Sequence, residues 1–224
     1  MKKSNKITIG ICSCILVVGL IGSIAFNNSN KNTNKNSTPE KITDLQADTA
    51  ISAYSNESKE IVEEPSFLLE NNDSTITKLV ADYYDAILNA DKKAYDAVTI
   101  DENSMDVDVM LRKMEYIEGY DNQKIYVTQG IDNVSLVVYV VYDLKIHTID
   151  TPAPSIDQLL IKNVKGKPKL YFNELTAKET KQLENIRNHE EVVDLIQSVD
   201  QRFVQAIETD SNLNDFYKAI SAKR

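Results

Sequence analysis

The sequence contains little of what many catalytic and disulfide-linked folds require. It has six glycines, no tryptophan and two cysteines in 224 residues. Few glycines leave little material for phosphate-binding loops, and the chain contains no such loop, no nucleophile elbow and no paired-histidine helix. Cys12 and Cys14 both lie in one apolar run, so the rest of the chain cannot form a disulfide and must be stabilised by an ordinary hydrophobic core.

Clustered positive charge is also scarce. The formal net charge is −9, and binding of nucleic acid phosphates needs stripes of Lys and Arg, so nucleic acid is excluded as an expected partner. Four lysines do surround one predicted turn, a pattern typical of a solvated hairpin tip. They are Lys162, Lys165, Lys167 and Lys169.

One segment has the composition of a membrane span. Residues 7–26 contain no charged side chain, and their length suits a helix that crosses the hydrocarbon layer. Lys2, Lys3 and Lys6 precede them, which places residues 1–6 in the cytoplasm and the rest outside, as a single-pass protein of the cell membrane. The alternative is a secreted protein with a signal peptide cleaved near Ser23-Ile24-Ala25; the length of the apolar run favours a retained anchor.

Residues 27–72 are predicted to be a polar linker. Residues 27–39 are an Asn-rich, low-complexity run that cannot bury enough apolar surface to fold. Scattered apolar residues follow up to residue 70, and we expect the FLLE segment, 67–70, to dock on the folded part. The folded domain is predicted to span 73–175, followed by a C-terminal helical extension over 176–224.

The first part of the domain shows helical periodicity. Apolar residues recur three or four apart after Asp73, which predicts a helix over 74–90 with Asp73 or Ser74 as its N-cap. A short helix is expected over 91–98. A third is expected over 105–118, ended by Gly119.

After Gly119 the pattern alternates, which predicts strands over 124–129, 134–149, 158–164 and 169–173. The last two are expected to form an antiparallel hairpin around 165–168. Pro152 and Pro154 are interpreted as residues that end the long strand and stiffen the turn after it. Helices are predicted again over 176–188, 189–210 and 211–222, and the middle one has a single apolar face.

The order of these elements resembles the NTF2-like, cone-shaped family over residues 74–173. The resemblance rests on ADYYDAILNADKKAYDAV and on the strands KIYVTQ, SLVVYVVYDLKI, QLLIKNV and KLYFN. It implies an α+β fold in which helices pack on a curved antiparallel sheet. With the anchor before it, the chain is similar in layout to VirB8- and TcpC-type conjugation and secretion components and to Gram-positive surface proteins.

Candidate site residues follow from the faces of the long strand. The face with Val138 and Tyr142 is the expected core side, so Asp143, Lys145 and His147 are expected to form a solvated row. The candidate pocket or surface residues are Tyr83, Tyr84, Tyr139, Asp143 and His147. No catalytic, cofactor or metal set is predicted: neither His147 nor His189 has ligand spacing, and the acids after His189 suit a helix N-terminus.

These observations favour a membrane-anchored, extracytoplasmic binding or scaffold protein of the cell envelope, with a protein or envelope component as its partner. The alternative is a small molecule bound in the cone, between the first helix and the sheet. An isomerase-like enzyme would require a buried Asp, Glu or His in that space.

Overall fold

A computed structural model of the chain describes residues 66–102 and 105–222. The predicted tail over 1–6, the anchor over 7–26 and the linker up to residue 65 lie outside the described residues. No helix within the described ranges has both the length and the apolar character needed to cross a membrane.

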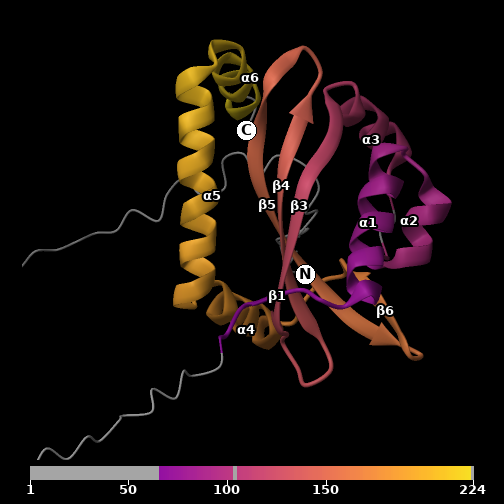
Figure 1. Cartoon of the computed structure of the whole chain (residues 1–224). Coiled ribbons are helices and arrows are strands. Elements are labelled where there is room, and N and C mark those ends of the chain that lie inside the picture. The colour runs from indigo at the N-terminus through magenta and orange to yellow at the C-terminus, as the bar shows by residue number, and fades with distance from the viewer. Residues whose placement is uncertain (1–65, 103–104, 223–224) are drawn as a thin grey trace, which may run out of the picture. The chain divides into compact units, whose positions relative to one another are not determined.

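The described residues form an α+β domain in which six helices pack on a curved mixed sheet (Figure 1). The helices are α1 (Ser74–Leu88), α2 (Lys92–Val98), α3 (Val107–Met114), α4 (Ala177–Arg187), α5 (Glu190–Thr209) and α6 (Ser211–Ser221). The strands are β1 (Leu69–Glu70), β2 (Thr99–Ile100), β3 (Ile117–Gln129), β4 (Leu136–Ile146), β5 (Ile149–Val164) and β6 (Lys167–Tyr171).

Local sequence explains where several helices begin. The Asp73 carboxylate accepts the Thr75 N–H at 2.7 Å at the start of α1, and Asp91 accepts the Ala94 N–H at the start of α2. At α4, Thr176 and Glu179 cap each other's backbone. These caps satisfy N–H groups that have no partner inside the helix, so each helix begins where the sequence supplies an oxygen.

The sheet order is β1-β3-β4-β5-β6-β2. The long strands pair antiparallel, as predicted, but β2 pairs with β6 in parallel, so the expectation of a purely antiparallel sheet was wrong. Strand β2 comprises two residues directly after α2. Its direction is set by that helix rather than by a hairpin turn.

The third helix is shorter than predicted. It ends at Met114, and residues 117–119 belong to β3. Ile117 is buried opposite Ile146 of β4, and Gly119 pairs with Lys145, so Gly119 does not end a helix. Pairing with β4 overrides a helical pattern that was weak in this segment.

The two prolines lie inside a strand, not beyond its end. Strand β4 stops at Ile146, the chain turns at His147 and Thr148, and β5 already begins at Ile149. Strand β6 pairs with β5 only from Ile161 onward. The earlier part of β5 therefore has one free edge, where a proline without an N–H costs no ladder hydrogen bond.

Both faces of the sheet are buried, whereas the sequence predicted one core face. Helices α1, α2 and α3 cover the first face, which includes Val138 and Leu144 of β4. Helices α4 and α5 cover the second face, where Val137 and Val141 are buried beneath Val192 and Val199 of α5. Helices α4 and α5 of the predicted C-terminal extension thus form the third layer of the domain (Figure 1).

Helix α6 returns to the first face. We call the hydrophobic cluster on the first face of the sheet the first core and the cluster on the second face the second core. Leu213 is buried in the first core, and the Phe216 ring lies 6.1 Å from the Tyr116 ring, just beyond α3. The Asp210 carboxylate at the start of α6 accepts hydrogen bonds from Thr151 of β5, which holds the helix at the free edge of that strand. This return brings α6 opposite α3.

The docking predicted for FLLE is confirmed. Leu69 and Glu70 form β1 and pair with β3. The Glu191 carboxylate at the start of α5 accepts the N–H groups of Phe67 and Leu68 at 2.8 and 3.1 Å. Residues 67–70 are therefore held on the domain, although the sequence placed them in the linker that was predicted to end at residue 72.

Candidate functional site

The five candidate residues do not come together in one place. Tyr83 and Tyr84 lie on the side of α1 that faces the sheet, and both are buried in the first core. Tyr139 lies on the same face of β4 as Asp143, which was expected to be solvated, and it is buried in the second core. Asp143 is partly buried, and His147 lies exposed in the β4–β5 turn.

The predicted solvated row is covered at one end by helix α5. Arg202 of α5 donates a hydrogen bond to Asp143 at 2.7 Å, and Asn122 donates a second at 2.9 Å. Lys145 forms an ion pair with Asp121 at 2.9 Å. These interactions connect β3 and β4 to each other and to α5, so Asp143 helps to hold α5 on the second face of the sheet.

A buried carboxylate lies in the first core, at a residue that sequence reasoning missed. Asp157 of β5 is 3% exposed. It accepts hydrogen bonds from the Tyr84 hydroxyl at 2.7 Å and the Tyr142 hydroxyl at 3.2 Å. Its second oxygen, Oδ1, is buried and has no hydrogen-bond partner among the described residues. The rings of Tyr84, Tyr120 and Tyr142 lie 4.7–5.5 Å apart around it.

Burial controls the protonation of this cluster. Removal of water around Asp157 raises its pKa to about 6, although the two tyrosine hydrogen bonds act in the opposite direction. Desolvation, together with the nearby Asp157 charge, raises the pKa of Tyr84 well above its usual value. Burial therefore brings the pKa of Asp157 closer to neutral pH than that of an exposed aspartate.

The signal for Asp157 was present in the sequence. It alternates with Leu159 and Ile161, which face the first core, so it is an acid in an apolar row. The prediction started this strand at Gln158 and therefore left Asp157 in a loop. The residue opposite Asp157 on β4 is Val140, also fully buried.

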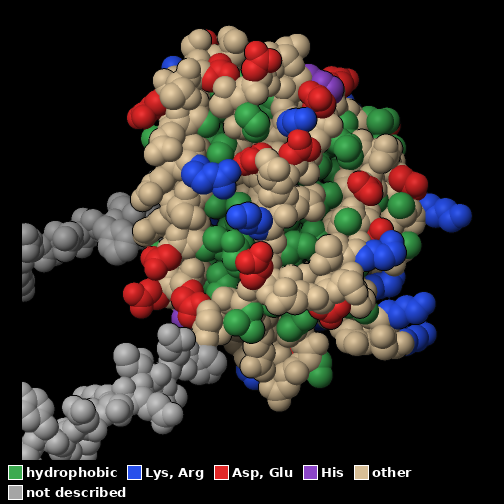
Figure 2. Space-filling model, in the orientation of Figure 1, with side chains coloured by type: hydrophobic (Ala, Val, Ile, Leu, Met, Phe, Trp, Pro, Cys, Tyr) green, Lys and Arg blue, Asp and Glu red, His purple; other side chains and the backbone are tan. Residues whose placement is uncertain are grey.

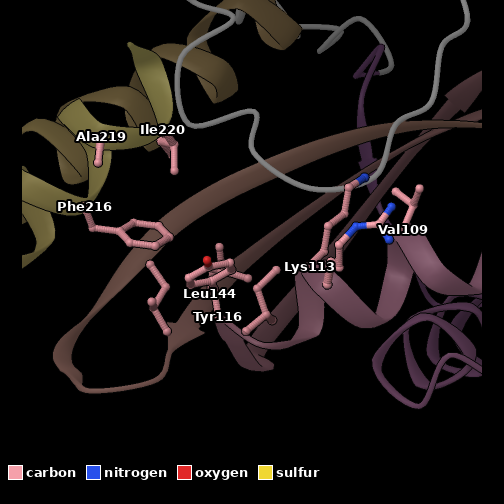
Figure 3. A pocket seen from close by; sticks show the side chains of 10 residues that line it. Val109, Lys113, Tyr116, Leu144, Phe216, Ala219 and Ile220 are labelled. Carbon is pink, nitrogen blue, oxygen red and sulfur yellow. The ribbon is translucent and has the colours of Figure 1, made fainter. Parts of the chain in front are cut away.

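An apolar groove lies between α3 and α6, and we call it the α3–α6 groove (Figure 3). Its volume is about 320 Å³. Its floor is formed by the adjoining ends of β3 and β4. The lining residues are Val109, Arg112, Lys113, Tyr116, Ile117, Leu144, Ile146, Phe216, Ala219 and Ile220. Figure 3 shows Phe216, Ala219 and Ile220 on α6, facing Lys113 and Val109 on α3.

The groove combines apolar walls with two cations. Eight of its ten lining residues are hydrophobic, and the other two are Arg112 and Lys113 in the last turn of α3. Arg112 is exposed and forms no ion pair or hydrogen bond with any described residue. Tyr116 is 54% exposed at the rim of the groove.

On the face seen in Figure 2, acidic and basic side chains are interspersed, and hydrophobic side chains show between them. Basic side chains gather at the lower right, where the β5–β6 turn lies in Figure 1. Among residues 66–102 and 105–222, no group of three His, Cys, Asp or Glu side chains is arranged to hold a metal ion.

The His189 side chain packs against the segment before β1. Its ring stacks on Phe67, with centroids 3.6 Å apart, next to the Glu191 carboxylate that binds the segment before β1. The sequence explained Glu191 by the helix dipole alone. Its hydrogen bonds to residues distant in sequence could not be read from the local pattern.

The sequence matches no protein-family model, and no curated protein or solved structure is significantly similar to it. The candidate function therefore rests on the groove, the buried Asp157 cluster and the physical chemistry of each.

Proposed function

We propose that the chain is a membrane-anchored binding protein, with its folded domain on the extracytoplasmic side and its binding site in the α3–α6 groove. The observation that carries the proposal is a groove of about 320 Å³ with eight hydrophobic lining residues. That volume lies at the lower end of the range of small-ligand sites, about 300–1,000 Å³. The anchor and the side of the membrane rest on residues 7–26 and the lysines before them.

The chemistry of the groove supports binding better than catalysis. Its described lining residues include no carboxylate, imidazole, thiol or aliphatic hydroxyl. Asp157, whose pKa is raised to about 6 by burial, does not line the groove and is enclosed by tyrosine rings. A general acid must come within hydrogen-bond distance of the reacting atom. Asp157 is not among the residues that line the groove, so it is not placed to act on a ligand bound there.

We also propose an NTF2-like, cone-shaped arrangement for residues 74–173. Two features support it: helix α1 packs against the curved sheet, and its Tyr83 and Tyr84 fill the space between them. In this arrangement the groove would be the remaining opening of the cone, bordered by α6. The proposal of a conjugation or secretion component rests on the layout of the sequence alone.

The position of the domain can be tested with the full chain in intact cells. Val204 of α5 is 46% exposed and does not line the groove. A V204C variant, with Cys12 and Cys14 replaced by serine, should react with a membrane-impermeant maleimide before lysis. Reaction only after lysis would refute the extracytoplasmic assignment.

Use of the groove can be tested by site-specific photocrosslinking in the same membranes. A photoreactive amino acid at Ala219, which is exposed on the groove wall, should form an adduct that the same residue at Val204 does not form. Filling the groove through Ile146→Phe should remove the Ala219 adduct. Equal adducts at both positions, or persistence of the adduct in the filled variant, would contradict the proposal.

A further inference from the structure

We propose that the α3–α6 groove binds a single-chain amphiphile with an anionic head, of the long-chain carboxylate type. The tail would lie against β4 and α6, and the carboxylate would bind Arg112. This inference rests on the proposed function, because it specifies the ligand class of the same groove.

The walls fit an alkyl chain better than a peptide. A bound peptide brings N–H and C=O groups that need hydrogen-bond partners when buried. Apart from the two cations and the Tyr116 hydroxyl, the described lining offers none, since its other side chains are Val, Ile, Leu, Phe and Ala. An alkyl chain has no such requirement, and each methylene removed from water contributes about 0.8 kcal/mol.

The charge of the groove selects the head group. The whole chain carries −9, yet both charged residues that line the groove are positive. Arg112 has five N–H donors in a planar fork that matches a carboxylate, and none of them is engaged by a described residue. An ammonium head would meet the like charge of Arg112, and an alcohol would lose the charge-assisted hydrogen bonds.

A simpler explanation of these cations is the dipole of α3. Cations in the last turn of a helix are favourable because the C-terminal end carries partial negative charge. That explanation requires no ligand. Arg187 provides the matched control, since it is an exposed arginine in the last turn of α4, outside the groove. Substitution of Arg112 should affect ligand binding more than substitution of Arg187 only if a ligand binds Arg112.

The probe is a dodecanoate analogue with a diazirine at the end of its tail, added to membrane vesicles that contain the full chain. After irradiation, mass spectrometry locates the adduct. We expect it on the α6 segment that contains Phe216 and Ile220. Unlabelled dodecanoate, dodecanol and dodecylammonium share one tail and differ in the head, so their competition ranks the head groups. We expect dodecanoate to compete best and dodecylammonium least.

Variants then separate head from tail. R112Q should lower labelling by roughly tenfold or more, as expected for loss of a charge-assisted hydrogen bond, and should abolish the advantage of dodecanoate over dodecanol. R112K should retain part of the advantage of dodecanoate over dodecanol, and R187Q should be labelled as strongly as the wild type. A219W, which fills the groove from an exposed position, should remove the adduct. Circular dichroism melting of each variant confirms that it is folded.

The outcomes distinguish the two proposals. Equal competition by dodecanoate and dodecanol in the wild type, or equal labelling of R112Q and R187Q, would refute selection of an anion while leaving the groove as the binding site. Adduct formation that is unchanged in A219W would show that the probe binds elsewhere. In that case both the ligand class and the assignment of the groove would be wrong.

Discussion

Asp157→Asn is expected to change how the stability of the domain depends on pH. The carboxyl group is buried between Tyr84 and Tyr142, and burial raises its pKa from 3.8 to about 6. In the unfolded chain this carboxyl group is in water. Between about pH 4 and pH 6 the folded protein therefore holds a proton that the unfolded chain has released.

The sign and size of the effect follow from proton linkage. The contribution of Asp157 to stability is fully present below about pH 4 and is lost as the pH rises through 6. A shift of about two pH units, at 1.36 kcal/mol per unit, corresponds to about 3 kcal/mol. The asparagine variant has nearly the same shape but does not titrate, so it avoids this loss.

The assay compares urea unfolding of the two proteins from about pH 4 to pH 8, followed by circular dichroism. Relative to the wild type, the variant should be more stable at pH 7 than at pH 4 by about 3 kcal/mol, or roughly 6–12 °C in melting temperature for a domain of this size. Exposed acids with lowered pKa, such as Asp73 and Glu191, also affect acid stability. They are common to both proteins, so they cancel in the comparison.

Asp150→Asn is the matched control, because Asp150 is exposed at the start of the same strand. A difference between Asp157→Asn and wild type that stays constant with pH would refute the reasoning, since desolvation would then not penalise the charge. A variant that becomes relatively less stable as the pH rises would show that the tyrosine hydrogen bonds outweigh desolvation.

Three further predictions concern the fold. Val138→Asp and Val137→Asp should each destabilise the domain by at least about 4 kcal/mol in urea unfolding, because both faces of β4 are fully buried; survival of the second variant would mean that α5 does not cover its face tightly. Glu191→Ala should speed proteolysis near Phe67 by releasing the segment before β1, with Glu190→Ala as control, and equal cleavage rates would argue against that contact. A chain without residues 1–26 should melt cooperatively in solution, since the described core begins after them, whereas aggregation would place part of the core within the removed residues.

The sequence was sufficient for most of the helices and for one hairpin. The period of Ile76, Leu79, Val80 and Tyr83 placed α1, and Asp73 marked its start. The β5–β6 turn followed from Gly166, which adopts a φ of 82° that side chains with a Cβ rarely tolerate. These features depend on neighbours within a few residues, so the local pattern contains the information.

The candidate site was predicted less well. The candidate residues Tyr83 and Tyr84 lie between α1 and the sheet. The face of β4 that carries Tyr139 was expected to be solvated, but it is buried under α4 and α5. The alternation of β4 gave its two faces and could not show that α5 would bury the second. Asp157 was missed because the prolines before it were interpreted as a strand end.

The sequence by itself determined the acidic charge, the anchor-like segment, the helical and strand periods and the absence of a catalytic motif. Only the tertiary structure decided that β2 runs parallel to β6, that Asp157 lies among tyrosines, and that α3 and α6 face each other across a groove. Val109 and Phe216 are separated by about half the chain. Their proximity depends on the free energy of packing all the layers together, which no short-range pattern records.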